Sequence, residues 1–284
     1  MTLPSDAFTR VAGSPAYAWN GIVTGLPVVF LHGFGDMAEC WFGLVNRLQL
    51  RQPVYLLDAP GHGQSPVDHT LHYIEHTVER AASFVRALRG PVLLVGHSMG
   101  ALEAMYLAGD LAGQVRGIVL EDPPMARDLA PWRDPALFAG LFGFLRSMRS
   151  QDFAEAVARA RREKPHWDDI EYEPWVRSKQ LVDVRVRDNF AIHREPMETT
   201  WARIHCPALL LTGARERGAI IDPDAAAWAR QQCPSLRVEH FPQASHDIRR
   251  DLADEVAPRV RAFLAECSTP SDMGGPNVTG AAPA

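Results

Sequence analysis

The alternation of short apolar runs with longer helical stretches is the feature that most constrains the fold of this 284-residue chain. Apolar runs of strand length are separated by segments with an apolar face at helical spacing. This pattern is typical of a mostly parallel sheet with helices on both faces, because parallel strands need crossover connections. The expected strands, about eight, are residues 8–12, 16–19, 28–32, 54–58, 92–97, 115–121, 208–213 and 237–241. The expected helices that cover them are residues 71–88, 99–111, 223–232 and 251–266.

One long segment interrupts this alternation. Residues 123–206 contain no convincing strand, yet they are too numerous for a loop, so they predict a helical cap inserted between two strands. The expected cap helices are residues 135–148, 152–163 and 175–189. The α/β core is then expected from residues 1–122 and 207–267, and the Gly- and Pro-rich residues 268–284 are expected to be a disordered tail.

Composition and charge exclude several classes of protein. Hydrophobic residues make up 46% and charged residues 22% of the chain, which indicates a globular protein. The net charge of −5, without a basic stripe, argues against a nucleic-acid partner. Residues 1–10 lack the apolar core of a signal peptide, and no apolar run could span a bilayer, so we expect a cytoplasmic protein without a membrane partner. The four cysteines lie far apart, which suggests reduced thiols, and the sequence indicates no oligomeric state.

A Gly-x-Ser-x-Gly sequence, Gly96-His97-Ser98-Met99-Gly100, lies between an expected strand and an expected helix. In this context the pattern indicates a sharp turn that lifts a serine hydroxyl above the edge of a sheet. The two glycines are needed because larger side chains would clash in so tight a turn. The helix that follows offers free N–H groups and a dipole that favour negative charge. Ser98 is therefore the candidate nucleophile.

A second glycine-rich turn, His32-Gly33-Phe34-Gly35, ends an earlier strand. There the backbone N–H of Phe34 could pair with that of Met99 to hold a developing oxyanion, a contribution of about 3 to 4 kcal/mol per donor. The same stretch, followed by Asp58, also mimics a dinucleotide-binding fingerprint. That alternative explains neither the Gly-x-Ser-x-Gly turn nor the Pro-Gly-His-Gly sequence of residues 60–63.

Together these motifs resemble the α/β-hydrolase fold family. The matching pieces are residues 32–35, the sequence Asp-Ala-Pro-Gly-His-Gly-Gln-Ser of residues 58–65, the Gly-x-Ser-x-Gly turn and a late histidine, and they span residues 8–265. The resemblance implies a catalytic triad in the chain order serine, acid, histidine. It also implies that no cofactor and no metal is required.

The resemblance places the base in the loop after the last strand, where His246 lies, whereas the rival His240 lies within that strand. The acid has two possible places in such enzymes. One is the turn after the penultimate strand, where this chain offers Glu216 and Asp222 in an imperfect version of the pattern. The other is the end of the strand before the cap, where Asp122 precedes two prolines. We favour Asp122 and keep Glu216 and Asp222 as alternatives.

A serine nucleophile predicts acyl transfer, since the dehalogenases and epoxide hydrolases of this fold carry aspartate there. We therefore expect a carboxylic ester or lactone hydrolase. The aromatic residues suggest a substrate with a hydrophobic or aromatic body, with Gly33, Trp41 and Trp132 as candidate substrate-binding residues. The alternatives are hydrolysis of a C–C bond, cofactor-free perhydrolysis and a small-molecule receptor that retains the triad. A helical face with His69, His72 and His76 lacks a carboxylate or cysteine at ligand spacing, so no metal site is expected.

Overall fold

The computed structural model describes residues 8–10, 16–19, 24–67, 73–125, 135–189 and 194–269. Within these residues the strands form one eight-stranded sheet in the order β1-β2-β4-β3-β5-β6-β7-β8. The strands from β4 to β8 along this order are parallel, and β1 and β2 join one edge antiparallel. The strands are β1 (Phe8–Arg10), β2 (Ala16–Trp19), β3 (Val28–Leu31), β4 (Val54–Leu57), β5 (Val92–His97), β6 (Val115–Glu121), β7 (Ala208–Thr212) and β8 (Leu236–His240). The mostly parallel sheet expected from the sequence is therefore confirmed.

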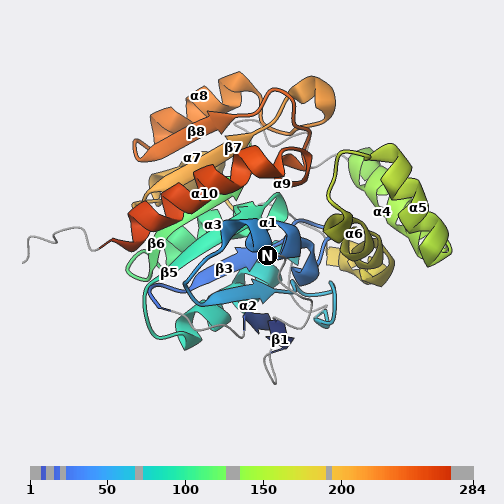
Figure 1. Cartoon of the computed structure of the whole chain (residues 1–284). Coiled ribbons are helices and arrows are strands. Elements are labelled where there is room, and N and C mark those ends of the chain that lie inside the picture. The colour runs from blue at the N-terminus through green and yellow to red at the C-terminus, as the bar shows by residue number, and fades with distance from the viewer. Residues whose placement is uncertain are drawn as a thin grey trace, which may run out of the picture.

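Helices cover both faces of the sheet (Figure 1). Helices α1 (Phe42–Leu48) and α10 (Ala253–Ser268) pack on one face, and α2 (Tyr73–Ala87), α3 (Met99–Asp110) and α8 (Pro223–Gln232) pack on the other. On β5, Val92 and Leu94 join the apolar cluster of the α2 and α3 layer, whereas Leu93 and Val95 join that of the α1 and α10 layer. The side chains of a strand alternate between its two faces, so a strand covered on both is apolar throughout.

The described part of the stretch between β6 and β7 holds helices and no strand, as expected. These are α4 (Pro135–Arg149), α5 (Phe153–Glu163), α6 (Asp169–Leu181), a 3₁₀ turn (Val184–Asn189) and α7 (Met197–Ala202). Figure 1 shows α4, α5 and α6 grouped to one side of the sheet. Helix α7 differs from them, because its Met197 and Trp201 are buried in the core cluster that contains α3. Among the described residues, no helix is long and apolar enough to span a bilayer.

Several helices differ from the sequence-based expectation. Helix α6 begins at Asp169, before the expected start at residue 175, and contains Pro174. A proline inside a helix removes one backbone hydrogen bond, which is why the sequence favoured a start after it. The 3₁₀ turn Ala38–Trp41, α1 and α7 were not expected, and the helix expected at 251–266 corresponds to α10, which the short α9 (Ile248–Asp251) precedes. Residues 71 and 72 of the helix expected at 71–88 lie outside the described residues.

Candidate active site

Ser98 lies in the expected sharp turn between β5 and α3. Its backbone has φ 52° and ψ −117°, a conformation that a residue with a side chain rarely adopts. The flanking glycines make this possible. A Cβ atom on Gly96 would collide with the backbone of Gly100, and one on Gly100 would collide with the carbonyl oxygen of Leu31 in β3.

Replacement of Gly100 by alanine is therefore expected to destabilise the fold by about 3 kcal/mol, because β3 and α3 must move apart. Urea unfolding of the purified variant measures this loss. Gly113→Ala is the matched control, since a Cβ at Gly113 meets nothing within 4 Å. Equal stabilities for the two variants would contradict the packing described.

Asp122 directly follows β6, and the structure brings it to His246 in the loop between β8 and α9. Oδ2 of Asp122 lies 2.6 Å from Nδ1 of His246. The same carboxylate accepts hydrogen bonds from the backbone N–H groups of Ile220 (2.7 Å) and Ile221 (2.9 Å). Asp122 is fully buried, so these partners compensate for the loss of water around its charge. Burial lowers the pKa of His246, but the hydrogen bond and charge of Asp122 outweigh it and raise that pKa above its ordinary value.

The two alternative acids have other surroundings. Glu216 is exposed in a 3₁₀ turn, Arg215–Arg217. Asp222 is the N-cap of α8, where its side chain accepts a hydrogen bond from the backbone N–H of Ala225 at 2.7 Å. The geometry therefore favours Asp122 as the partner of His246.

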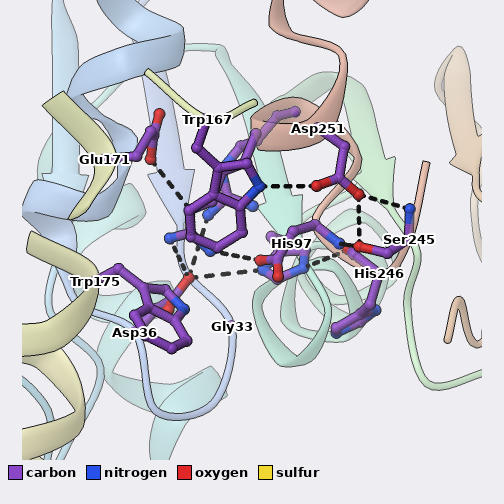
Figure 2. A network of polar contacts seen from close by, with 12 residues as sticks. Gly33, Asp36, His97, Trp167, Glu171, Trp175, Ser245, His246 and Asp251 are labelled. Carbon is purple, nitrogen blue, oxygen red and sulfur yellow. Dashed lines mark hydrogen bonds and ion pairs between the residues drawn. The ribbon is translucent and has the colours of Figure 1, made fainter. Parts of the chain in front are cut away.

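His97 connects the serine turn to the histidine loop. Its Nε2 donates a hydrogen bond to the carbonyl oxygen of His246 at 3.1 Å, and the two imidazole rings lie 4.7 Å apart (Figure 2). His97 immediately precedes Ser98, so this contact holds the loop that carries His246 beside the candidate nucleophile. The sequence had left His97 without a role of its own.

The turn from Gly33 to Asp36 lies against Ser98. A Cβ atom on Gly33 would be 3.2 Å from the Cβ of Ser98. The turn is closed by a hydrogen bond from the Asp36 N–H to the Gly33 carbonyl at 3.0 Å, and Gly35 has φ +78°, as the third residue of a type II turn requires. Phe34 therefore lies in the middle of a turn beside Ser98, where the sequence expected an oxyanion donor.

Two buried histidines fix the backbone of this turn. His32 donates from Nδ1 to the Gly33 carbonyl at 2.9 Å and accepts the Ala59 N–H at Nε2 at 3.0 Å. His62 accepts the Gly35 N–H at Nε2 at 2.9 Å. Burial lowers the pKa of His62 to about 3, so its ring stays neutral and can accept this bond.

The surroundings of Phe34 and Met99 are apolar. Phe34 packs edge-on against His62, Tyr73 and Phe142, with ring centroids 5.2 to 5.9 Å apart. The apolar cluster around these residues draws on both the core and the segment between β6 and β7. Its buried members are Tyr73, Met99, Phe142, Leu145, Val182 and Val186.

The other predicted binding residues have different outcomes. Trp41 is fully buried, packs on Phe30 and lies under the guanidinium of Arg249, so its contacts are those of a core residue. Trp132, like His69 and His72, lies outside the described residues. Asp58 accepts hydrogen bonds from the backbone N–H groups of Ala38 (2.9 Å) and Gln64 (3.1 Å). The carboxylate that would bind ribose in a dinucleotide site is thus engaged in holding two loops together.

The comparison with known families identifies the fold. Residues 28–259 match the sequence profile of the Alpha/beta hydrolase family. The chain belongs to this family.

Several hydrolases are similar to this α/β hydrolase. The (E)-2-((N-methylformamido)methylene)succinate hydrolase of Acinetobacter baylyi is 29% identical over 66% of this chain and 72% of its own length. The pimeloyl-[acyl-carrier protein] methyl ester esterase of Aeromonas hydrophila is 32% identical over 48% of this chain. This chain spans about half the length of that esterase and of a similar Mycobacterium tuberculosis lipase, at 52% of each.

Solved structures show the same fold. The crystal structure of E-2-(acetamidomethylene)succinate hydrolase superposes with a TM-score of 0.71 at 20% identity, over 88% of this chain and 95% of that one. An esterase of M. tuberculosis superposes with a TM-score of 0.71 at 22% identity, over 91% of each chain.

Proposed function

We propose that this α/β hydrolase cleaves a carboxylic ester or lactone with a hydrophobic or aromatic body through a Ser98-His246-Asp122 triad. The observation that carries the proposal is the 2.6 Å contact between Asp122 and His246 beside the strained turn that presents Ser98. The esterases among the similar proteins support the same reaction class.

In the proposed mechanism, His246 takes the proton of the Ser98 hydroxyl as its oxygen attacks the substrate carbonyl carbon. Asp122 holds His246 in the tautomer that presents Nε2 to the serine and stabilises the imidazolium that forms. The backbone N–H groups of Phe34 and Met99 stabilise the negative charge that develops on the carbonyl oxygen. His246 then returns the proton to the leaving group, and water activated by the same histidine releases the acid.

The apolar cluster at Phe34 and Met99 supports a substrate with a hydrophobic body. An apolar group placed against these side chains would bury apolar surface on both sides of the contact, which is favourable. Helix α4, Val182 just after α6 and Val186 in the following 3₁₀ turn supply part of this cluster, so this segment would serve as the cap. We propose that the cap includes α4, α5 and α6 and that α7 packs with the core.

A panel of p-nitrophenyl esters, aromatic esters, lactones and β-diketones tests the proposal. We expect turnover of medium-chain or aromatic esters or lactones, with kcat/KM falling when a carboxylate is added to the acyl group. Turnover of the diketones alone would favour C–C bond hydrolysis. Stabilisation by these compounds without repeated turnover would favour a receptor.

The dependence of turnover on pH tests the role of His246. Only the neutral imidazole can accept a proton, and Asp122 raises the pKa of His246 above 6.5. The kcat/KM for an ester is thus expected to increase with pH through an apparent pKa above 6.5 and to be lost below it. An acid limb centred below pH 6 would contradict the charge pairing described.

A further inference from the structure

Six ionisable side chains form a buried cluster next to the candidate active site, which we name the Asp36 cluster. Each of them is at most 6% exposed, and they are Asp36, Glu121, Glu171, Lys179, Arg249 and Arg250. Asp36 is the centre. Its Oδ1 lies 2.5 Å from Nζ of Lys179, and its Oδ2 lies 2.9 Å from Arg250 and 3.2 Å from Arg249. Burial would raise the pKa of Asp36, but Arg250, Lys179 and Arg249 together hold it well below its usual range.

The two glutamates complete the cluster. Glu121 accepts hydrogen bonds from the guanidinium of Arg249 at 2.9 Å and from its backbone N–H at 2.7 Å. Glu171 pairs with Arg250 at 3.1 Å. Removing such charges from water costs several kcal/mol per ion, and apolar side chains of similar volume often give a fold at least as stable. Stability alone therefore does not account for the cluster.

The cluster joins the pieces from which the active site is built. Asp36 closes the turn that contains Phe34, Glu121 precedes Asp122, and the two arginines lie on α9 just after His246. Nδ1 of His97 lies 3.8 Å from Oδ2 of Asp36. Figure 2 shows Asp36 within this network, with Glu171 and His97 drawn on either side of it.

Helix α6 contributes the remaining partners, Glu171 and Lys179. Besides Asp36, the Lys179 ammonium binds the carbonyl oxygen of Gly35 at 2.9 Å, so it holds the backbone of the turn directly. The residues just before α6 make a second connection, because Nε1 of Trp167 donates to Asp251 at 2.8 Å. Asp251 in turn binds the backbone N–H and hydroxyl of Ser245, the neighbour of His246 (Figure 2).

We infer that Lys179 and Asp36 are positioning residues that hold the oxyanion-binding turn in its working geometry only while α6 is docked on the core. This inference rests on the proposed function, because it assigns the turn to oxyanion binding. Oxyanion donors are effective when they are fixed before the charge develops. Lys179 holds the carbonyl group of Gly35, the residue after Phe34, so its loss loosens the turn that carries the Phe34 N–H.

Lys179→Met tests the inference, with Lys164→Met as the matched control, because these are the only two lysines of the chain. Lys164 lies in the same segment, with its Nζ over the Trp167 ring. For an ester substrate we expect kcat of Lys179→Met to fall about 10- to 100-fold with KM changed less than about threefold, since the transition state alone loses a donor. Lys179→Arg is expected to recover part of kcat.

A double-mutant cycle and amide hydrogen exchange complete the test. Asp36→Asn is expected to lower kcat by a similar factor. The double variant, Asp36→Asn with Lys179→Met, is expected to lower kcat by much less than the product of the two single-variant factors, because the two side chains act together. In the wild type, we expect residues 33–36 and α6 to open with the same free energy, as measured by the exchange of their amide hydrogens. This part of the test uses the wild type alone and so does not depend on the folding of a variant. Faster exchange of residues 33–36 is expected in Lys179→Met but not in Lys164→Met.

Two results would overturn the inference. One is a folded Lys179→Met that turns over like Lys164→Met, or that changes KM alone. The other is opening of the turn independently of α6 in the wild type. A wild type that neither hydrolyses esters nor reacts with a phosphonate would instead overturn the proposed function and the positioning role with it, while hydrogen exchange would still report whether α6 holds the turn.

Discussion

Ser98→Ala is expected to lower ester turnover by about 10⁴-fold or more, because it removes the only group that forms the acyl-enzyme. The residual rate comes from the oxyanion donors and substrate binding. The fold should be preserved, since alanine accepts the turn no worse than serine does. Steady-state kinetics on the best ester of the panel, with circular dichroism of each variant, measures both effects.

The control for this variant is Ser150→Ala, which removes an exposed serine hydroxyl just after α4. It should turn over at the wild-type rate. If Ser98→Ala kept more than a hundredth of the wild-type kcat, the nucleophile would have to be another residue, and the strained turn would need a different explanation.

The second large effect is expected for Asp122→Asn, which should lower kcat by about 10³- to 10⁴-fold. An amide donates where the carboxylate accepts, so it favours the wrong tautomer of His246 and no longer stabilises its charged form. The variant also places an amide against the Ile220 and Ile221 N–H groups, so its stability must be measured alongside. Kinetics at several pH values, with urea unfolding, gives the two contributions separately.

Glu216→Gln and Asp222→Asn are the comparison variants for the acid. Both should keep kcat within about threefold of the wild type, because Glu216 is exposed and asparagine can replace aspartate as the N-cap of α8. A large loss in either, with a small loss in Asp122→Asn, would show that the contact with His246 is not the one used in catalysis.

The sheet and the serine turn could be predicted because their signals are local. Each strand is a short apolar run between turn residues, and the Gly96 to Gly100 motif specifies its own backbone. The acid was harder to predict. The contact between Asp122 and His246 joins residues 124 positions apart, and the position of Asp122 at a strand end before two prolines favoured it over Glu216 and Asp222 without deciding between them.

The Asp36 cluster could not be predicted from the sequence. Its members come from several distant segments, and charged residues such as Lys179 and Arg250 are usually solvent-exposed. Helix α6, which carries Lys179, begins six residues before the expected start at residue 175, because Pro174 is a residue type that usually lies outside helices. Trp41 was expected to bind substrate, but its side chain is fully buried. A large aromatic residue after a glycine-rich turn suits a binding site and a core equally well, so the sequence could not separate the two.

Covalent labelling of the wild type by an alkyl fluorophosphonate, followed by intact mass and peptide mapping, tests the central claim most directly. The reagent reports an activated serine beside an oxyanion site whatever the natural substrate is. We predict one adduct per chain, located on Ser98 and absent from Ser98→Ala. A folded protein that acquires no adduct, or acquires it on a different residue, would contradict the assignment of Ser98 as the nucleophile.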